Sequence, residues 1–158
     1  MNEPAPPAWF RLRKDLSAPL APPVLPDGVR LLPLATIPPP ALHALLVSAY
    51  ANGGGTVADF QTWWTRLVED SEFDSALVFI AVDPADQPVA LCQCWSGGFI
   101  KDLVVAAPWR GRGLAEAMLL TAFGTLKARG LPHVDLKVET QNAGAQRLYA
   151  RVGMVEIA

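Results

Sequence analysis

Charge is scarce in this sequence. Charged residues make up 18% of the 158 residues, and 13 basic against 15 acidic side chains leave a formal net charge of -2. Domains that bind nucleic acid through phosphate contacts usually carry a basic excess, which these totals lack. We therefore expect neither nucleic acid nor an anionic membrane surface as a partner, while a local basic patch stays compatible with the composition.

Cysteine and histidine are also rare, with two residues of each. Cys92 and Cys94 are only two positions apart in an apolar stretch, where a mutual disulfide would have poor geometry. Two buried free thiols fit a reducing compartment, so the expected location is the cytoplasm. His43 and His133 do not combine with the cysteines into a spacing that is typical of a metal site, and no metal is expected.

Long hydrophobic runs are missing as well, although 51% of the residues are hydrophobic. No segment is long and apolar enough to span a bilayer. The first 25 residues contain no uninterrupted apolar stretch of the kind found in secretory signals. The length predicts a single domain that can bury a substantial core.

Proline, by contrast, is concentrated at the start of the chain. Residues 1–27 contain "EPAPPAW" and "SAPLAPPVLPDG", and such proline density disfavours both a helix and a central strand. We expect residues 1–27 to form an extended arm, anchored by Trp9 and Phe10. It would be draped over one domain that spans residues 28–158.

Hydrophobic periodicity divides residues 28–158 into six strands and four helices. The expected strands cover residues 29–34, 75–82, 88–95, 99–107, 133–139 and 154–158. The expected helices cover residues 38–51, 56–68, 111–129 and 143–152. The order β-α-α-β-β-β-α-β-α-β predicts an α/β or α+β domain with a mixed sheet and helices packed on it.

Two arginines and two glycines, "RGRG" at 110–113, stand where the strand at 99–107 turns into the next helix. A helix N-terminus exposes unpaired N–H groups and the positive end of its dipole, which together attract anions. Glycines let an anion approach the backbone, and arginines suit phosphate. The alternative is a tight turn whose arginines are merely solvated. The chain carries neither a Walker A loop nor the third glycine of a dinucleotide fingerprint at this place.

The same stretch resembles the acetyl-CoA-binding signature of the GNAT (Gcn5-related N-acetyltransferase) superfamily. The phosphate loop of that family, [QR]-x-x-G-x-[GA], is matched by Arg110, Gly111, Arg112, Gly113, Leu114 and Ala115 after the "LVV" strand. The family's next signature, N-x-x-A-x-x-L-Y-x-x-x-G-[FM], is matched by Asn142, Ala145, Leu148, Tyr149, Gly153 and Met154. Both motifs occur in the family's order, and the resemblance covers residues 99–155.

The resemblance implies a GNAT-like fold, with a mixed, splayed sheet of about six strands, four helices and a short C-terminal strand. It implies that acetyl-CoA lies between the strands that precede the two C-terminal helices. The main chain of 103–105 would pair with the pantetheine, and N–H groups of 112–115 would bind the pyrophosphate. The implied cofactor contacts are Leu103, Val104, Val105, Arg110, Gly111, Arg112, Gly113, Leu114, Ala115 and Asn142.

Acetyl transfer to an amine needs a neutral nitrogen and a proton for the leaving thiolate. Tyr149 follows Asn142 by two helical turns, so both can face the cofactor, and the resemblance implies that Tyr149 protonates the CoA sulfur. The alternative for Tyr149 is a tyrosine that packs in the core, and the alternative for Asn142 is a helix N-cap. Glu139 is our candidate for the base and Asp102 is the second, and either can instead be structural or face solvent.

The acceptor is expected beside the first two helices and the "NGGG" loop at 52–55, with Tyr50, Trp63 and Trp64 as walls. We expect an N-acetyltransferase that moves the acetyl group of acetyl-CoA directly to a primary amine of a small molecule or peptide. The alternatives are a non-catalytic acyl-CoA binding module and an interaction domain that works through its arm. Similar proteins usually continue into a further hairpin strand after the position of Ala158. The open sheet edge therefore needs cover, from the arm or from a second subunit of a homodimer.

Overall fold

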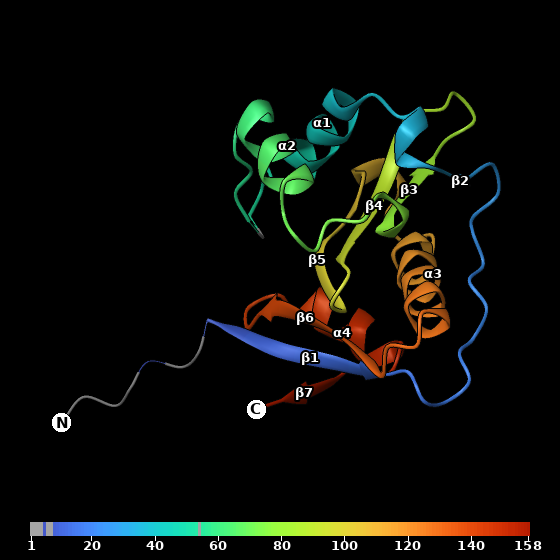
Figure 1. Ribbon diagram of the computed structural model, residues 1–158, viewed down its shortest axis with the longest axis vertical. Helices are drawn as coiled ribbons and strands as arrows, with labels where there is room; N and C mark the ends of the chain where they lie inside the picture. Colours follow the sequence, from blue (N-terminus) through green and yellow to red (C-terminus); the bar gives the residue numbers. More distant parts are fainter. Residues whose placement is uncertain (1–4, 6–7, 54) are drawn as a thin grey trace.

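One seven-stranded sheet organises residues 5, 8–53 and 55–158, which are the residues that this computed structural model describes (Figure 1). The strands are β1 (Trp9–Asp15), β2 (Arg30–Leu32), β3 (Val78–Val82), β4 (Pro88–Trp95), β5 (Phe99–Val105), β6 (His133–Glu139) and β7 (Val155–Ile157). Their order across the sheet is β2-β3-β4-β5-β6-β1-β7. The pairing of β5 with β6 is parallel and the other pairings are antiparallel, so the predicted mixed sheet is confirmed.

Four α-helices cover the two faces of this sheet, as the periodicity predicts (Figure 1). They are α1 (Pro39–Ala49), α2 (Phe60–Val68), α3 (Leu114–Ala128) and α4 (Ala143–Arg151). Short 3-10 turns occupy Leu34–Thr36, Ser75–Leu77 and Ala107–Trp109. The helices α1 and α2 pack on one face against Ile80, Leu91 and Val104. The helices α3 and α4 pack on the opposite face, around Phe123 and Leu136. The sheet thus lies between two separate apolar cores.

The proline-rich start of the chain differs from the expected arm. Residues 9–15 form β1, which lies between β6 and β7 and pairs with both. The prolines stand outside this segment, and within it Leu12 is buried in the core while Arg11 and Arg13 on either side of it point to the opposite face. The expectation of no central strand here is therefore wrong, and the sheet has one strand more than the predicted six. Of the predicted arm, residues 1–4 and 6–7 lie outside the described residues.

A buried carboxylate fixes β1 to its neighbour. Asp135 on β6 has a side chain only 3% exposed, and it accepts hydrogen bonds from the side chains of Arg11 and Arg13 at 2.8–3.0 Å. The hydrogen bond from Arg13, aided by the one from Arg11, holds the pKa of Asp135 below its usual range. Residues 16–26 then run without helix or strand along α3 toward β2 (Figure 1).

The C-terminal strand β7 is three residues long and occupies the sheet edge beyond β1. The sequence predicts that the edge at the C-terminal strand is covered by the arm or by a second subunit. Strand β1, from the N-terminal segment, pairs with β7. Among the described helices, none combines the length and the apolar composition that crossing a membrane requires.

Candidate active site

The parallel strands β5 and β6 separate soon after they begin. Only Phe99 and Asp135 are paired between them. Beyond this pair the strands diverge, and a cavity of about 880 Å³ opens between them and the N-terminal ends of α3 and α4. The splay that the family resemblance implies is therefore present, and it opens this cavity in the sheet.

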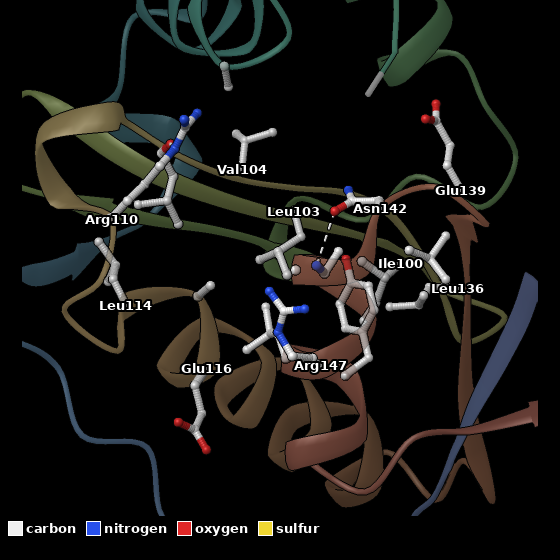
Figure 2. Close-up of a pocket in the computed structure, with 18 of the residues that line it drawn as sticks. Ile100, Leu103, Val104, Arg110, Leu114, Glu116, Leu136, Glu139, Asn142 and Arg147 are labelled. Carbon is white, nitrogen blue, oxygen red and sulfur yellow. Dashed lines mark hydrogen bonds between the residues drawn. The ribbon is translucent and has the colours of Figure 1, made fainter. Parts of the chain in front are cut away.

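One wall of this cavity is the free backbone edge of β5. Leu103, Val104 and Val105 pair with β4 on one side and have no paired residue on the β6 side in the described ladder. Figure 2 shows Leu103 and Val104 along this wall. An extended ligand that carries amide groups can add to such an edge through main-chain hydrogen bonds. This edge is where the family resemblance implies that pantetheine would pair.

The second wall is the start of α3. Gly111 and Gly113 adopt left-handed φ values of 75° and 77°, a conformation that costs glycine little, and they turn the chain sharply before Leu114. Gly113 is the N-cap and has no side chain that could satisfy the first N–H groups of the helix. These N–H groups therefore stay available to an anion, which is what the sequence predicts for this turn. The helix itself begins at Leu114, later than the expected position near residue 111.

The two arginines of the turn behave differently. Arg110 lines the cavity, and its Nε donates to the carbonyl of Val105 at 3.2 Å. Arg112 places its guanidinium 4.7 Å from the ring centroid of Trp109, and it is not among the residues that line the cavity. The other predicted cofactor residues of the loop, Gly111, Gly113, Leu114 and Ala115, all border it.

The third wall belongs to α4. Asn142 lines the cavity and is also the N-cap, because its Oδ1 accepts a hydrogen bond from the N–H of Ala145 at 3.1 Å (Figure 2). Tyr149 lines the same cavity and is only 9% exposed. Burial, together with the nearby Cys92 thiol, raises the pKa of Tyr149 to about 12. The phenol therefore holds its proton at neutral pH and can act as a donor.

The two candidate bases lie in different places. Glu139 is exposed at the end of β6 on the rim of the large cavity (Figure 2). Asp102 borders a second cavity of about 470 Å³, and its Oδ1 accepts a hydrogen bond from Tyr50 Oη at 2.8 Å. The sequence thus predicts both carboxylates as candidate bases, but it does not predict that they border different cavities.

The second cavity lies between α1, α2 and the β4–β5 hairpin, where the acceptor is expected. Tyr50 and Trp63 are among its walls as predicted, whereas Trp64 is not and packs against Trp63 instead. Tyr50 and Lys101 border both cavities, so the two openings meet there. The expected "NGGG" wall cannot be described in full, because Gly54 lies outside the described residues.

Several residues that line the large cavity are not predicted from the sequence: Trp109, Glu116, Lys137, Arg147 and Arg151. Arg147 turns its guanidinium into the cavity, whereas the Glu116 carboxylate points away from it (Figure 2). Arg151 approaches Glu116 at 3.8 Å and links α4 to α3. The four-residue spacing of Arg147 and Arg151 places them on one helix face, but nothing in the sequence says that this face borders the cofactor.

This cleft in a splayed sheet is the arrangement that the family resemblance implies, and comparisons with known proteins agree on the family. The acetyltransferase (GNAT) family matches residues 40–154 of the chain. The chain therefore belongs to the GNAT family of acetyltransferases.

Two relatives resemble almost the whole chain. It is 31% identical to the mycothiol acetyltransferase of Thermobispora bispora, over 92% of this chain and 53% of that protein. A GCN5-related N-acetyltransferase from Sphaerobacter thermophilus superposes with a TM-score of 0.78 at 29% identity, over 94% of this chain and 48% of the other. The chain thus spans about half the length of each of these two relatives.

A more distant structure shares the fold alone. The NatC complex bound to Gag peptide and CoA matches with a TM-score of 0.64 and 18% identity, over 82% of this chain and 86% of that chain. CoA is thus bound to a complex that contains this fold.

Proposed function

We propose that this chain is an acetyl-CoA-dependent N-acetyltransferase that passes the acetyl group directly to a primary amine of a small molecule or peptide. The observation that carries the proposal is the large cavity. It brings together an uncapped helix start for phosphate, a free strand edge for pantetheine and a buried phenol for the sulfur. We further propose that the protein works in the cytoplasm, where the Cys92 and Cys94 thiols remain reduced.

In the proposed reaction the pyrophosphate rests on the N–H groups at the start of α3, and the pantetheine lies along β5. The acceptor enters from the smaller cavity as an ammonium ion and loses one proton to a carboxylate, for which Glu139 is our candidate. The nitrogen lone pair then forms a bond to the thioester carbon. When the C–S bond breaks, Tyr149 gives its proton to the sulfur, and the second proton of the nitrogen restores the phenol.

The names of the relatives support acetyl transfer but point to different acceptors. The relative from Thermobispora bispora is named for mycothiol, whereas the NatC complex was solved with a Gag peptide. The smaller cavity, at about 470 Å³, accommodates either a small amine or one residue of a peptide.

The test is release of free thiol from acetyl-CoA with a panel of primary amines, alongside the thermal shift produced by CoA. We expect CoA to stabilise the protein, since binding to the native state alone raises its stability. We also expect at least one amine to accelerate thiol release. A CoA-dependent shift without turnover on any amine would contradict the enzyme and favour a binding module. Absence of both effects would contradict the cofactor site itself.

A further inference from the structure

A nearly buried carboxylate stands where the two cavities meet. The side chain of Asp102 on β5 is 13% exposed. Its Oδ1 accepts the hydrogen bond from Tyr50, and its Oδ2 accepts one from Lys101 Nζ at 3.0 Å. The carboxylate therefore already holds a primary ammonium group, which here belongs to the protein's own lysine.

The backbone explains how neighbouring residues can make this contact. The register between β4 and β5 shifts so that Gln93 faces Asp102 and Cys94 faces Ile100, which leaves Lys101 as the extra residue of a β-bulge. A bulge disrupts the alternation of a strand and can bring consecutive side chains toward the same side. Since Lys101 borders both cavities, the ion pair of Lys101 and Asp102 lies beside the passage where the cavities meet.

The surroundings of the pair favour a cation. Trp63 and Trp95 contribute to the smaller cavity, and aromatic faces attract ammonium groups. Gln93, the cross-strand neighbour of Asp102, is 2% exposed, and within the described residues its Oε1 has no hydrogen-bond partner. Burial and the charge of Asp102 raise the pKa of Tyr50 far above its ordinary value, so this phenol stays protonated and keeps donating to the carboxylate.

We propose that Asp102, positioned by Tyr50, binds the ammonium group of the acceptor at this passage and exchanges Lys101 for it. The inference rests on the proposed function and narrows its substrate class. The acceptor is a primary amine that is cationic at neutral pH and carries a compact apolar part that fits between Trp63 and Trp95. Lys101 has a side chain 39% exposed, and it can leave the carboxylate for solvent when the acceptor arrives.

If the acceptor displaces Lys101 from Asp102, substitutions of these two residues should change KM in opposite directions. Asp102→Asn removes the charge that binds the ammonium, and kcat/KM for ethanolamine, benzylamine, tyramine or glucosamine should fall roughly 10- to 100-fold, mainly through KM. Tyr50→Phe should lower it about threefold to tenfold by releasing one oxygen of the carboxylate. Lys101→Met removes the competing ammonium and should lower KM for the same amines. A purely structural role of the pair would raise KM in all three variants.

A matched control distinguishes direct binding by Asp102 from a general effect of negative charge in the cavity. Glu69 borders the same cavity and makes no ion pair in the part of the chain that the structure describes. Glu69→Gln removes one charge and leaves the Tyr50 contact intact, so its effect on KM should stay well below that of Asp102→Asn. An equal effect would overturn the assignment to Asp102. The CoA-dependent thermal shift of each variant shows whether it is folded.

A binding measurement decides the inference independently of turnover. Tryptophan fluorescence of the CoA-bound protein is titrated with benzylamine and with benzyl alcohol, its neutral analogue of the same shape. The unmodified protein should prefer the amine, and Asp102→Asn should lose that preference. A protein that shows no preference for benzylamine overturns the inference even if an amine is acetylated. Acetylation of Lys101 itself, detected by peptide mass spectrometry as the main product, would overturn it as well. Lack of turnover alone contradicts the proposed enzyme, not the ammonium site.

Discussion

The two cavities that meet at Tyr50 and Lys101 are built in opposite ways. The larger offers two main-chain features to a cofactor, a free strand edge on β5 and an uncapped helix start at Gly113. The smaller is made of side chains such as Trp63, Trp95 and Asp102. Backbone sites depend on glycines and turns at fixed spacing, which a motif records. Side-chain walls impose no spacing, so the sequence predicts the cofactor far better than the acceptor.

The proposed role of Tyr149 in the larger cavity depends on a side-chain atom and not on the main chain. Tyr149→Phe keeps the ring that packs in α4 and removes the proposed proton donor. Turnover on the best amine should fall by roughly 10²–10⁴, the range for loss of a positioned general acid, provided that chemistry limits the rate. Pre-steady-state kinetics would measure the chemical step.

Acetyl-CoA affinity supplies the internal control for this variant. It should change little, since the backbone walls of the cavity are untouched. A near-normal chemical step in Tyr149→Phe would mean that water or another group protonates the sulfur and that the buried phenol is there for packing.

Gly113→Glu tests the main-chain half of the comparison directly. The new carboxylate would stand at the helix start where phosphate is proposed to bind, and φ of 77° strains any L-residue. CoA affinity should fall about 100-fold, the loss expected when charge-assisted hydrogen bonds are replaced by repulsion. Isothermal titration with CoA measures this change.

Gly113→Ala separates charge from strain at the same position. No heavy atom lies within 4 Å of the added Cβ, so the variant should lose some stability through its φ angle and still bind CoA. If both variants lose CoA binding equally, backbone conformation rather than charge controls the site. If neither does, the phosphate is held elsewhere.

The fold likewise has elements that local sequence predicts and one strand, β1, that it does not. The RGRG turn, the Asn142 cap and all four helices follow from local signals in the sequence. Local patterns do not predict strand β1, because the prolines on both sides of it suggest an arm and because its partners are more than a hundred residues away. Pairing across that distance depends on Asp135 meeting Arg11 and Arg13, a contact that no local pattern announces.

Asp135→Asn should therefore weaken the β1 side of the sheet without changing the choice of acceptor. Removing a buried charge with two arginine partners should cost about 1–3 kcal/mol in the free energy of unfolding, measured with urea. The pKa of Asp135 is depressed in the folded protein, so its contribution is full above the unfolded pKa. The difference between wild type and variant should shrink as pH falls below about 4. If the difference in the free energy of unfolding were the same at all pH values, the charge of Asp135 would not be its cause.

The smallest expected effect distinguishes two arginines near the same ligand. Arg147 turns into the large cavity and has no hydrogen-bond or ion-pair partner among the described residues, so we predict that it contacts a CoA phosphate. Arg112 belongs to the motif but stacks on Trp109 outside the lining. Because the contact is solvent-exposed, Arg147→Ala should weaken acetyl-CoA binding only about threefold to tenfold.

Arg112→Ala should change acetyl-CoA affinity less than Arg147→Ala, since its main-chain N–H is kept and its side chain faces the indole. Titrating both variants with CoA and with dephospho-CoA reports which phosphate is involved. A loss at Arg147 that disappears with dephospho-CoA assigns the contact to the 3′-phosphate, and a loss that persists assigns it to the pyrophosphate. A larger loss at Arg112 than at Arg147 would show that this side chain leaves Trp109 when CoA binds. The phosphate-loop motif at 110–115 would then specify a side-chain contact with CoA as well as main-chain contacts.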